Sequence, residues 1–124
     1  MNYAFEEKLL AHMLTDEKIY NRVINANAIE FFARPDVKRL AYIIKDYKNT
    51  PDADLEYIIR EEKLENTWAR IMLSIDDAPL KDYEISDFLK KVAIKKEQRK
   101  WQEMYQQLNS IGQEGDFNSM LTFV

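Results

Sequence analysis

One long segment of helix-forming residues, Leu80–Ile111, constrains the fold of this chain most. Two apolar patches recur in it at the spacing of a helix face. The first patch consists of Ile85, Phe88, Leu89 and Val92, and the second of Trp101, Met104, Tyr105, Leu108 and Ile111. Between them, Lys95–Lys100 (the neck) contains no apolar residue. A helix that packs on a single core would have a continuous row of apolar side chains. The interrupted row predicts a helix of roughly 45 Å that connects two separate apolar cores.

The composition favours helices throughout the chain. Only two glycines and three prolines occur among 124 residues, too few turn residues for a β protein, and the 46% of hydrophobic residues suffice for a core. We therefore predict an all-α fold, with a helical bundle over residues 1–94, a long connecting helix, and a helical hairpin over 95–124. The last helix, Phe117–Val124, stops on apolar residues, and we expect that the chain is cut within it.

Five helices are expected in the bundle before the long one. Apolar residues recur every three or four positions over 3–14, 16–24, 35–47, 55–62 and 66–75. Thr15 is expected to cap the second helix, and the fifth is expected to bury Trp68, Ile71, Met72 and Ile75. Since the neck has no apolar side chain to hold it against either core, we predict a local bend or a break there.

The sequence offers no residues for catalysis. Cysteine is absent, which excludes disulfides and Cys-ligated zinc and favours a reducing compartment. His12 is the only histidine and is interpreted as a hydrogen-bonded packing residue. The adjacent acids Asp76-Asp77 and Glu61-Glu62 diverge rather than converge on one ion, and neither glycine lies in a phosphate-binding loop. We therefore predict no catalytic residue, no cofactor and no metal site in this chain.

The charge pattern gives little support for nucleic-acid or membrane binding. The formal net charge is −4, so strong binding to nucleic acid is not expected. The basic residues Lys90–Lys100 point several ways around a helix axis, which favours a solvated neck over a phosphate-binding strip. No stretch approaches the ~18–20 apolar residues of a membrane span, and no signal peptide is evident. We expect a cytoplasmic protein.

Residues 5–16 carry a resemblance to a known family. Phe5-Glu6-Glu7-Lys8-Leu9-Leu10-Ala11-His12-Met13-Leu14-Thr15-Asp16 resembles the opening of the C-terminal domain of bacterial DnaG-type primases. There, an acid-rich start leads into a helix of this type and then a short charged turn. Later features follow in the same order along essentially the whole chain: Phe31-Phe32, Tyr47, Asp76-Asp77 and Gly115-Asp116. The first motif is the most specific of them.

The resemblance implies a helical bundle followed by a hairpin that docks on the N-terminal domains of the replicative helicase in the bacterial replisome. It implies that the bundle modulates helicase activity, and that the primer-synthesising and zinc-binding domains lie elsewhere in a parent primase. This chain alone is then non-catalytic and is expected to be monomeric in isolation. The implied docking surface consists of Trp101, Tyr105, Leu108, Ile111, Phe117, Met120 and Leu121.

Two other readings stay open. The N-terminal domain of the replicative helicase shares the expected fold, but it usually carries a glycine in the first helix where this chain has Ala11. A helical module that binds nucleic acid through Lys90–Lys100 is the second. A salt titration would separate it from protein docking, because phosphate contacts weaken steeply with salt.

Overall fold

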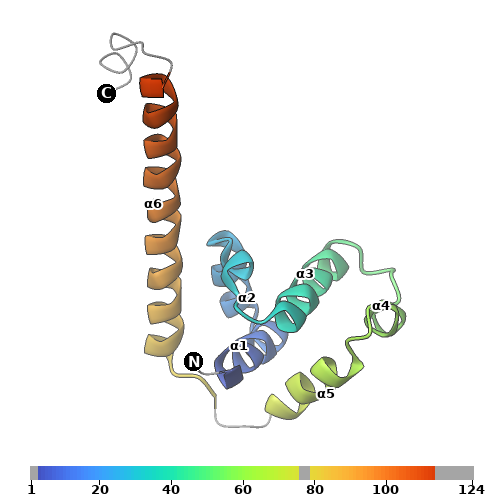
Figure 1. Cartoon of the computed structure of the whole chain (residues 1–124). Helices are drawn as coiled ribbons and strands as arrows, with labels where there is room; N and C mark the ends of the chain where they lie inside the picture. Colours follow the sequence, from blue (N-terminus) through green and yellow to red (C-terminus); the bar gives the residue numbers. More distant parts are fainter. Residues whose placement is uncertain (1–2, 76–78, 114–124) are drawn as a thin grey trace. The chain divides into compact units, whose positions relative to one another are not determined.

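The structure, a computed structural model, describes residues 3–75 and 79–113, and these residues form helices and no strand. The predicted all-α class is thereby confirmed. The elements, shown in Figure 1, are α1 (Tyr3–Thr15), α2 (Glu17–Asn25), the 3-10 helix η1 (Ala28–Phe31), α3 (Pro35–Asn49), α4 (Leu55–Glu61), α5 (Glu65–Ser74) and α6 (Asp82–Gln113). The expected Asp76-Asp77 turn, the Gly115-Asp116 turn and the final helix lie outside the described residues.

The chain divides into two compact units, Met1–Leu89 and Lys90–Val124. The boundary falls inside α6, whereas the sequence placed it after residue 94. The first unit contains α1 to α5 together with the first turns of α6. The rest of α6 belongs to the second unit, and each unit is described by itself.

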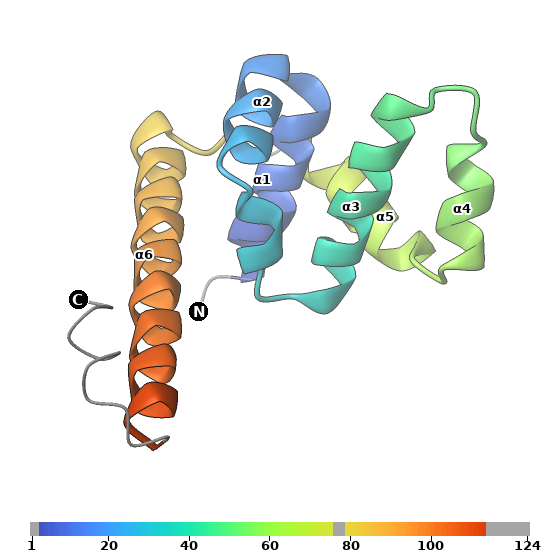
Figure 2. The same cartoon turned by 90° about the horizontal axis from the view of Figure 1, so that it is seen from above.

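Helix α1 lies at the centre of the first unit and packs on α2, α3 and α5, as the views in Figures 1 and 2 agree. Its inward face carries apolar residues three and four positions apart, which is the spacing of one helix face. Completely or almost completely buried side chains come from four helices: Leu9, Leu10, Met13, Val23, Leu40, Ile44 and Ile71. Each contributes roughly 1.5–3 kcal/mol by leaving water.

The start of α6 is packed within the first unit by aromatic and polar contacts. The ring of Phe88 lies 5.3 Å from that of Phe5 and 5.9 Å from that of Phe32, measured between centroids. The Arg22 guanidinium donates to the Asp82 carboxylate at 3.0 Å and to the Ser86 hydroxyl at 3.1 Å. These contacts attach the first two turns of α6 to α1, α2 and the residue that follows η1.

Two local predictions are wrong. Asp16, not Thr15, caps α2, because its carboxylate accepts from the Lys18 amide at 3.0 Å. The Thr15 hydroxyl instead donates to the Ala11 carbonyl at 3.1 Å and so belongs to the last turn of α1. Ile75 is 39% exposed rather than buried. It is the C-cap of α5, beyond the turns that face the core.

A network of charged side chains ties α1, α3 and α5 together. Arg34 pairs with Glu7 and with Asp36, and the Glu7 and Arg34 side chains are only 14% and 16% exposed. Arg70 approaches Glu7 at 3.1 Å and Asp36 at 3.3 Å. The Thr67 hydroxyl donates to Asp36 at 2.9 Å. Because each charge has an opposite partner, the network offsets the cost of removing these groups from water.

Asp36→Asn is expected to lower the free energy of unfolding near neutral pH. It should also make that free energy depend less on pH in the acid range. Burial raises the pKa of the Asp36 carboxyl, but hydrogen bonds from Arg34 and Thr67 outweigh it and hold that pKa below its ordinary value of 3.8. The stabilisation is therefore present above the unfolded pKa of about 3.9 and is lost as the pH falls through the folded pKa. Removing the charge should cost about 1–2 kcal/mol at pH 7.

Thermal melts of both proteins between pH 2 and 7 check this expectation. The wild-type curve should fall more steeply in the acid range than that of Asp36→Asn. Parallel curves would show that Asp36 does not titrate differently in the folded and unfolded states.

Candidate partner-binding face

Helix α6 is continuous from Asp82 to Gln113, over 32 residues. Of the bend or break predicted at the neck, Lys95–Lys100, the break is therefore wrong. Lysine, glutamate, glutamine and arginine are all strong helix formers, and a helix satisfies its backbone hydrogen bonds within itself. The neck can thus remain helical without an apolar side chain that packs on either unit.

Amides in the neck should still exchange with solvent faster than amides at 40–47. Lys95 and Lys100 are exposed, whereas the segment 40–47 in α3 contains the fully buried Leu40 and Ile44. Opening a helical turn costs less free energy where few side chains are buried. Hydrogen exchange followed by mass spectrometry or NMR measures both segments in one sample. Equal protection would show that tertiary packing clamps the neck.

The second unit carries a set of exposed large apolar side chains. Ile94 is 58% exposed, Trp101 62%, Met104 44% and Tyr105 69%, and Leu108 is half-buried. These five residues are called the apolar face of α6. Ile94, Trp101, Tyr105 and Leu108 follow one another at spacings of seven, four and three residues. At 3.6 residues per turn they lie on one side of the helix, along roughly 21 Å of its length.

The structure brings three of the seven predicted docking residues together. Trp101, Tyr105 and Leu108 all lie on the apolar face. Ile111 belongs to α6, but its side chain is not described. Three further predicted residues lie outside the described residues: Phe117, Met120 and Leu121.

Ile94 is an exposed residue of this face that the two sequence patches omit. It is only two residues from Val92 but about 200° further around the helix, so it does not share the face of the first patch, and the neck separates it from the second patch. Its position seven residues before Trp101, which is two helical turns, is the signal that could have identified it.

Four exposed lysines accompany this face. Lys90, Lys91, Lys95 and Lys100 all have exposed side chains. No ion pair joins any of the four to another residue within 3–75 or 79–113. The α6 segment of the second unit therefore combines an apolar line with unneutralised positive charge.

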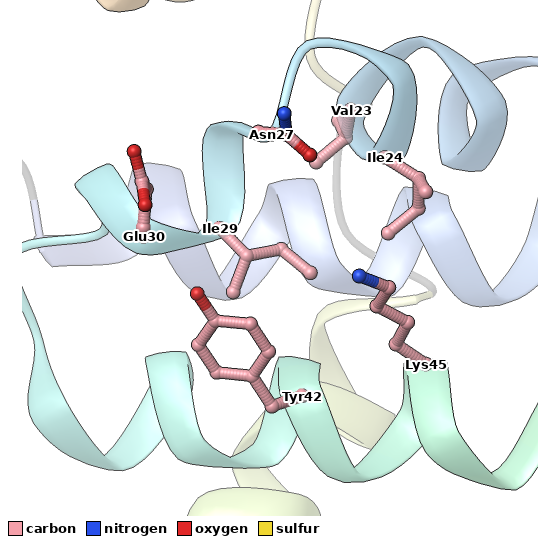
Figure 3. A pocket seen from close by; sticks show the side chains of 7 residues that line it. All are labelled: Val23, Ile24, Asn27, Ile29, Glu30, Tyr42 and Lys45. Atoms are coloured by element: carbon pink, nitrogen blue, oxygen red, sulfur yellow. The ribbon is translucent and has the colours of Figure 1, made fainter.

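The pocket between α2, η1 and α3 is smaller than a typical small-molecule site. The pocket in Figure 3 has a volume of about 130 Å³, below the roughly 300–1,000 Å³ of typical ligand sites. Side chains from α2, η1 and α3 and the Asn27 turn line it: Val23, Ile24, Asn27, Ile29, Glu30, Tyr42 and Lys45.

A larger cleft of about 300 Å³ lies between α3 and α4. Its walls include Ile43, Tyr47 and Ile58, and Arg39 stands at the rim. The Arg39 guanidinium is already paired with Glu62 at 2.6 Å. The cleft is mainly apolar, although Asp46 and Thr50 also line it. The bond recorded between these two residues joins the Thr50 amide to the Asp46 carbonyl of the backbone, which gives no support for a nucleophile activated by a base.

The remaining candidates for chemistry have structural roles. The His12 Nε2 accepts a hydrogen bond from the Leu80 amide at 2.9 Å, which confirms its interpretation as a hydrogen-bonded packing residue. Within 3–75 and 79–113, no group of three or more histidine and acidic residues is placed to hold a metal ion. Nor is any helix in these ranges both long and apolar enough to cross a membrane.

No family model, curated protein or solved structure matches this chain.

Proposed function

We propose that this chain is a non-catalytic docking domain of a bacterial DnaG-type primase, and that it binds the N-terminal domains of the replicative helicase. The observation that carries the proposal is the apolar face of α6, where Trp101 and Tyr105 are 62% and 69% exposed. Tryptophan and tyrosine are enriched among the residues that dominate binding at protein interfaces. Contiguous exposed apolar surface on a soluble domain commonly marks an interaction site.

The identity of the partner is supported by the family resemblance. The motif Leu9-Leu10-Ala11-His12-Met13 opens the chain, and the other features occur in the family's order. In that family the element after the bundle docks on the helicase, and here the exposed aromatic residues occupy the corresponding part of the chain. Primer synthesis is assigned to other domains of the parent primase, in the bacterial cytoplasm.

A nucleic-acid-binding module is the second candidate. The observation in its favour is the set of exposed lysines on α6, Lys90, Lys91, Lys95 and Lys100. The net charge of −4 for the whole chain argues against it. Binding to single-stranded DNA that is tight at low salt and falls steeply with added salt would favour this candidate.

An equilibrium binding measurement tests the proposal. The chain is titrated into the isolated N-terminal domains of the replicative helicase from the same organism, and the heat of binding is recorded. We expect saturable binding in the micromolar range or tighter. No detectable binding up to about 100 µM, where the free energy would be weaker than about −5.5 kcal/mol, would contradict the proposal.

A further inference from the structure

Positive charge is concentrated next to the apolar face of α6. Residues 90–100 include six basic side chains and one acidic side chain, Glu97, which is a net charge of +5 in a chain whose overall charge is −4. Ile94 lies within this segment, and Lys100 directly precedes Trp101. From residue 101 to 113 the only charged residue is Glu103. The face therefore has a basic half around Ile94 and an almost uncharged half around Trp101 and Tyr105.

The spacing of the face indicates that its complement is another helix. Ile94, Trp101 and Leu108 recur at intervals of seven residues, with Met104 and Tyr105 between them. A seven-residue interval is the repeat with which two helices pack side chains along a shared line, and both of its apolar positions are filled over Trp101–Leu108, whereas Glu97 and Gln98 take the second position between Ile94 and Trp101. A helix of about 15 residues would cover the roughly 21 Å between Ile94 and Leu108.

Charge distinguishes among the helices that could pack there. A second copy of this chain, aligned in parallel, would place the +5 segment 90–100 beside itself, and like charges in apposition oppose association. An antiparallel copy would place that segment beside residues 101–113, where Glu103 is the only acidic side chain. Residues 117–124 of this chain are Phe, Asn, Ser, Met, Leu, Thr, Phe and Val, without a single charged side chain. That segment cannot neutralise Lys90, Lys91, Lys95 or Lys100.

We infer that the apolar face of α6 binds an acidic amphipathic helix of a partner protein. The apolar stripe of that helix packs on Ile94, Trp101 and Tyr105, and its acidic side chains neutralise Lys90 and Lys91, which lie within about 70° of the face around the helix axis. This inference rests on the proposed function and adds to it the chemistry of the element that the helicase would present. Complementary charges of this kind steer association and select the partner more than they raise affinity.

Two synthetic peptides test the inference with the full chain. Each has about three heptads with leucine at the two core positions, and the flanking positions carry glutamate in one peptide and lysine in the other. Binding is followed by the anisotropy of a dye on the peptide, and the Trp101 environment by NMR of its indole N–H. We expect at least a tenfold tighter Kd for the acidic peptide at ~50 mM salt, and a smaller difference at ~500 mM.

Matched variants separate charge from packing. Lys90→Glu/Lys91→Glu lowers the net charge of residues 90–100 from +5 to +1 and should largely remove the preference for the acidic peptide. Lys18→Glu/Lys81→Glu, which makes the same change in charge at exposed positions of the first unit, should leave the preference unchanged. Trp101→Ala should weaken binding of the acidic peptide at least tenfold. Equal binding of both peptides by the wild-type chain would overturn the inference.

The remaining outcomes tell the inference apart from the proposed function. Binding of the helicase domains without binding of either peptide would overturn the inference and leave the proposed function standing. Binding of the acidic peptide without the helicase would retain the inference and exclude that partner. Two results would overturn the inference by identifying another occupant of the face. Concentration-dependent self-association that Trp101→Ala abolishes would identify a second copy of the chain. Nuclear Overhauser contacts between Trp101 and Phe117, together with no binding of either peptide, would identify residues 117–124 of the same chain.

Discussion

Tyr105→Ala is expected to weaken binding to the helicase N-terminal domains about thirty-fold. Truncating a large aromatic anchor at an interface commonly costs ~2 kcal/mol or more, which corresponds to that factor. Because the Tyr105 side chain is 69% exposed in the free chain, its removal takes little packing away from the fold. The affinity is measured by calorimetry and the melting temperature by circular dichroism, on the same preparation.

Tyr57→Ala is the matched control for this variant. Tyr57 is 57% exposed and lies on α4, in the first unit, so the same atoms are removed from a different surface. We expect wild-type affinity from Tyr57→Ala and melting temperatures for both variants close to that of the wild type. If Tyr105→Ala binds like the wild type while Tyr57→Ala does not, the docking surface lies on the bundle.

Leu40→Ala is expected to destabilise the first unit by about 3 kcal/mol. Leu40 is completely buried in α3, among helices that pack on α1, and a leucine-to-alanine change in a core removes apolar contacts and leaves a cavity. The loss is a large fraction of the roughly 5–15 kcal/mol that stabilises a typical domain. Urea unfolding followed at the helical signal measures it.

Leu73→Ala provides the comparison. Leu73 is 74% exposed on α5, so the same atoms are removed without a cavity, and the change should stay within ~0.5 kcal/mol. A cost for Leu73→Ala that matches the cost for Leu40→Ala would show that the end of α5 is buried in solution.

The helices could be predicted well from the sequence because local signals determine them. The apolar spacing around Leu9, Leu10 and Met13 and around Leu40 and Ile44 indicated α1 and α3 with their buried faces. Pro35 is found in the first turn of α3, where its missing N–H has no partner to lose. The small number of glycines also favoured helices. Each of these signals spans only a few neighbouring residues.

The sequence did not predict which of two neighbouring residues caps a helix, nor which distant residues form ion pairs. Thr15 and Asp16 are both good capping residues, and only the structure shows which one bonds forward into α2. The pairing of Glu7 with Arg34 and Arg70 joins residues 27 and 63 positions apart. No local pattern specifies such partners, because the packing of α1, α3 and α5 brings them together.

The candidate site also includes residues that the sequence predicted and one residue that it missed. Helical spacing placed Trp101, Tyr105 and Leu108 in one apolar patch, and the family resemblance implied that they dock on a partner. In the structure they share one face of α6. Ile94 was overlooked because the lysines around it dominate the local composition. The break expected at the neck was wrong, because side-chain burial was taken as a requirement for helix continuity. Residues such as Lys95 and Lys100 favour the helix by their own propensity.

The most direct test of helicase docking through α6 is to map the surface of the chain that the proposed partner protects. Hydrogen exchange of the full chain is compared with and without the helicase N-terminal domains, and the Trp101 indole signal is followed in the same titration. We expect slower exchange centred on residues 94–108 and a shifted Trp101 signal, with α3 and α4 unchanged. Protection confined to α1–α5 with an unchanged Trp101 signal would contradict docking through α6.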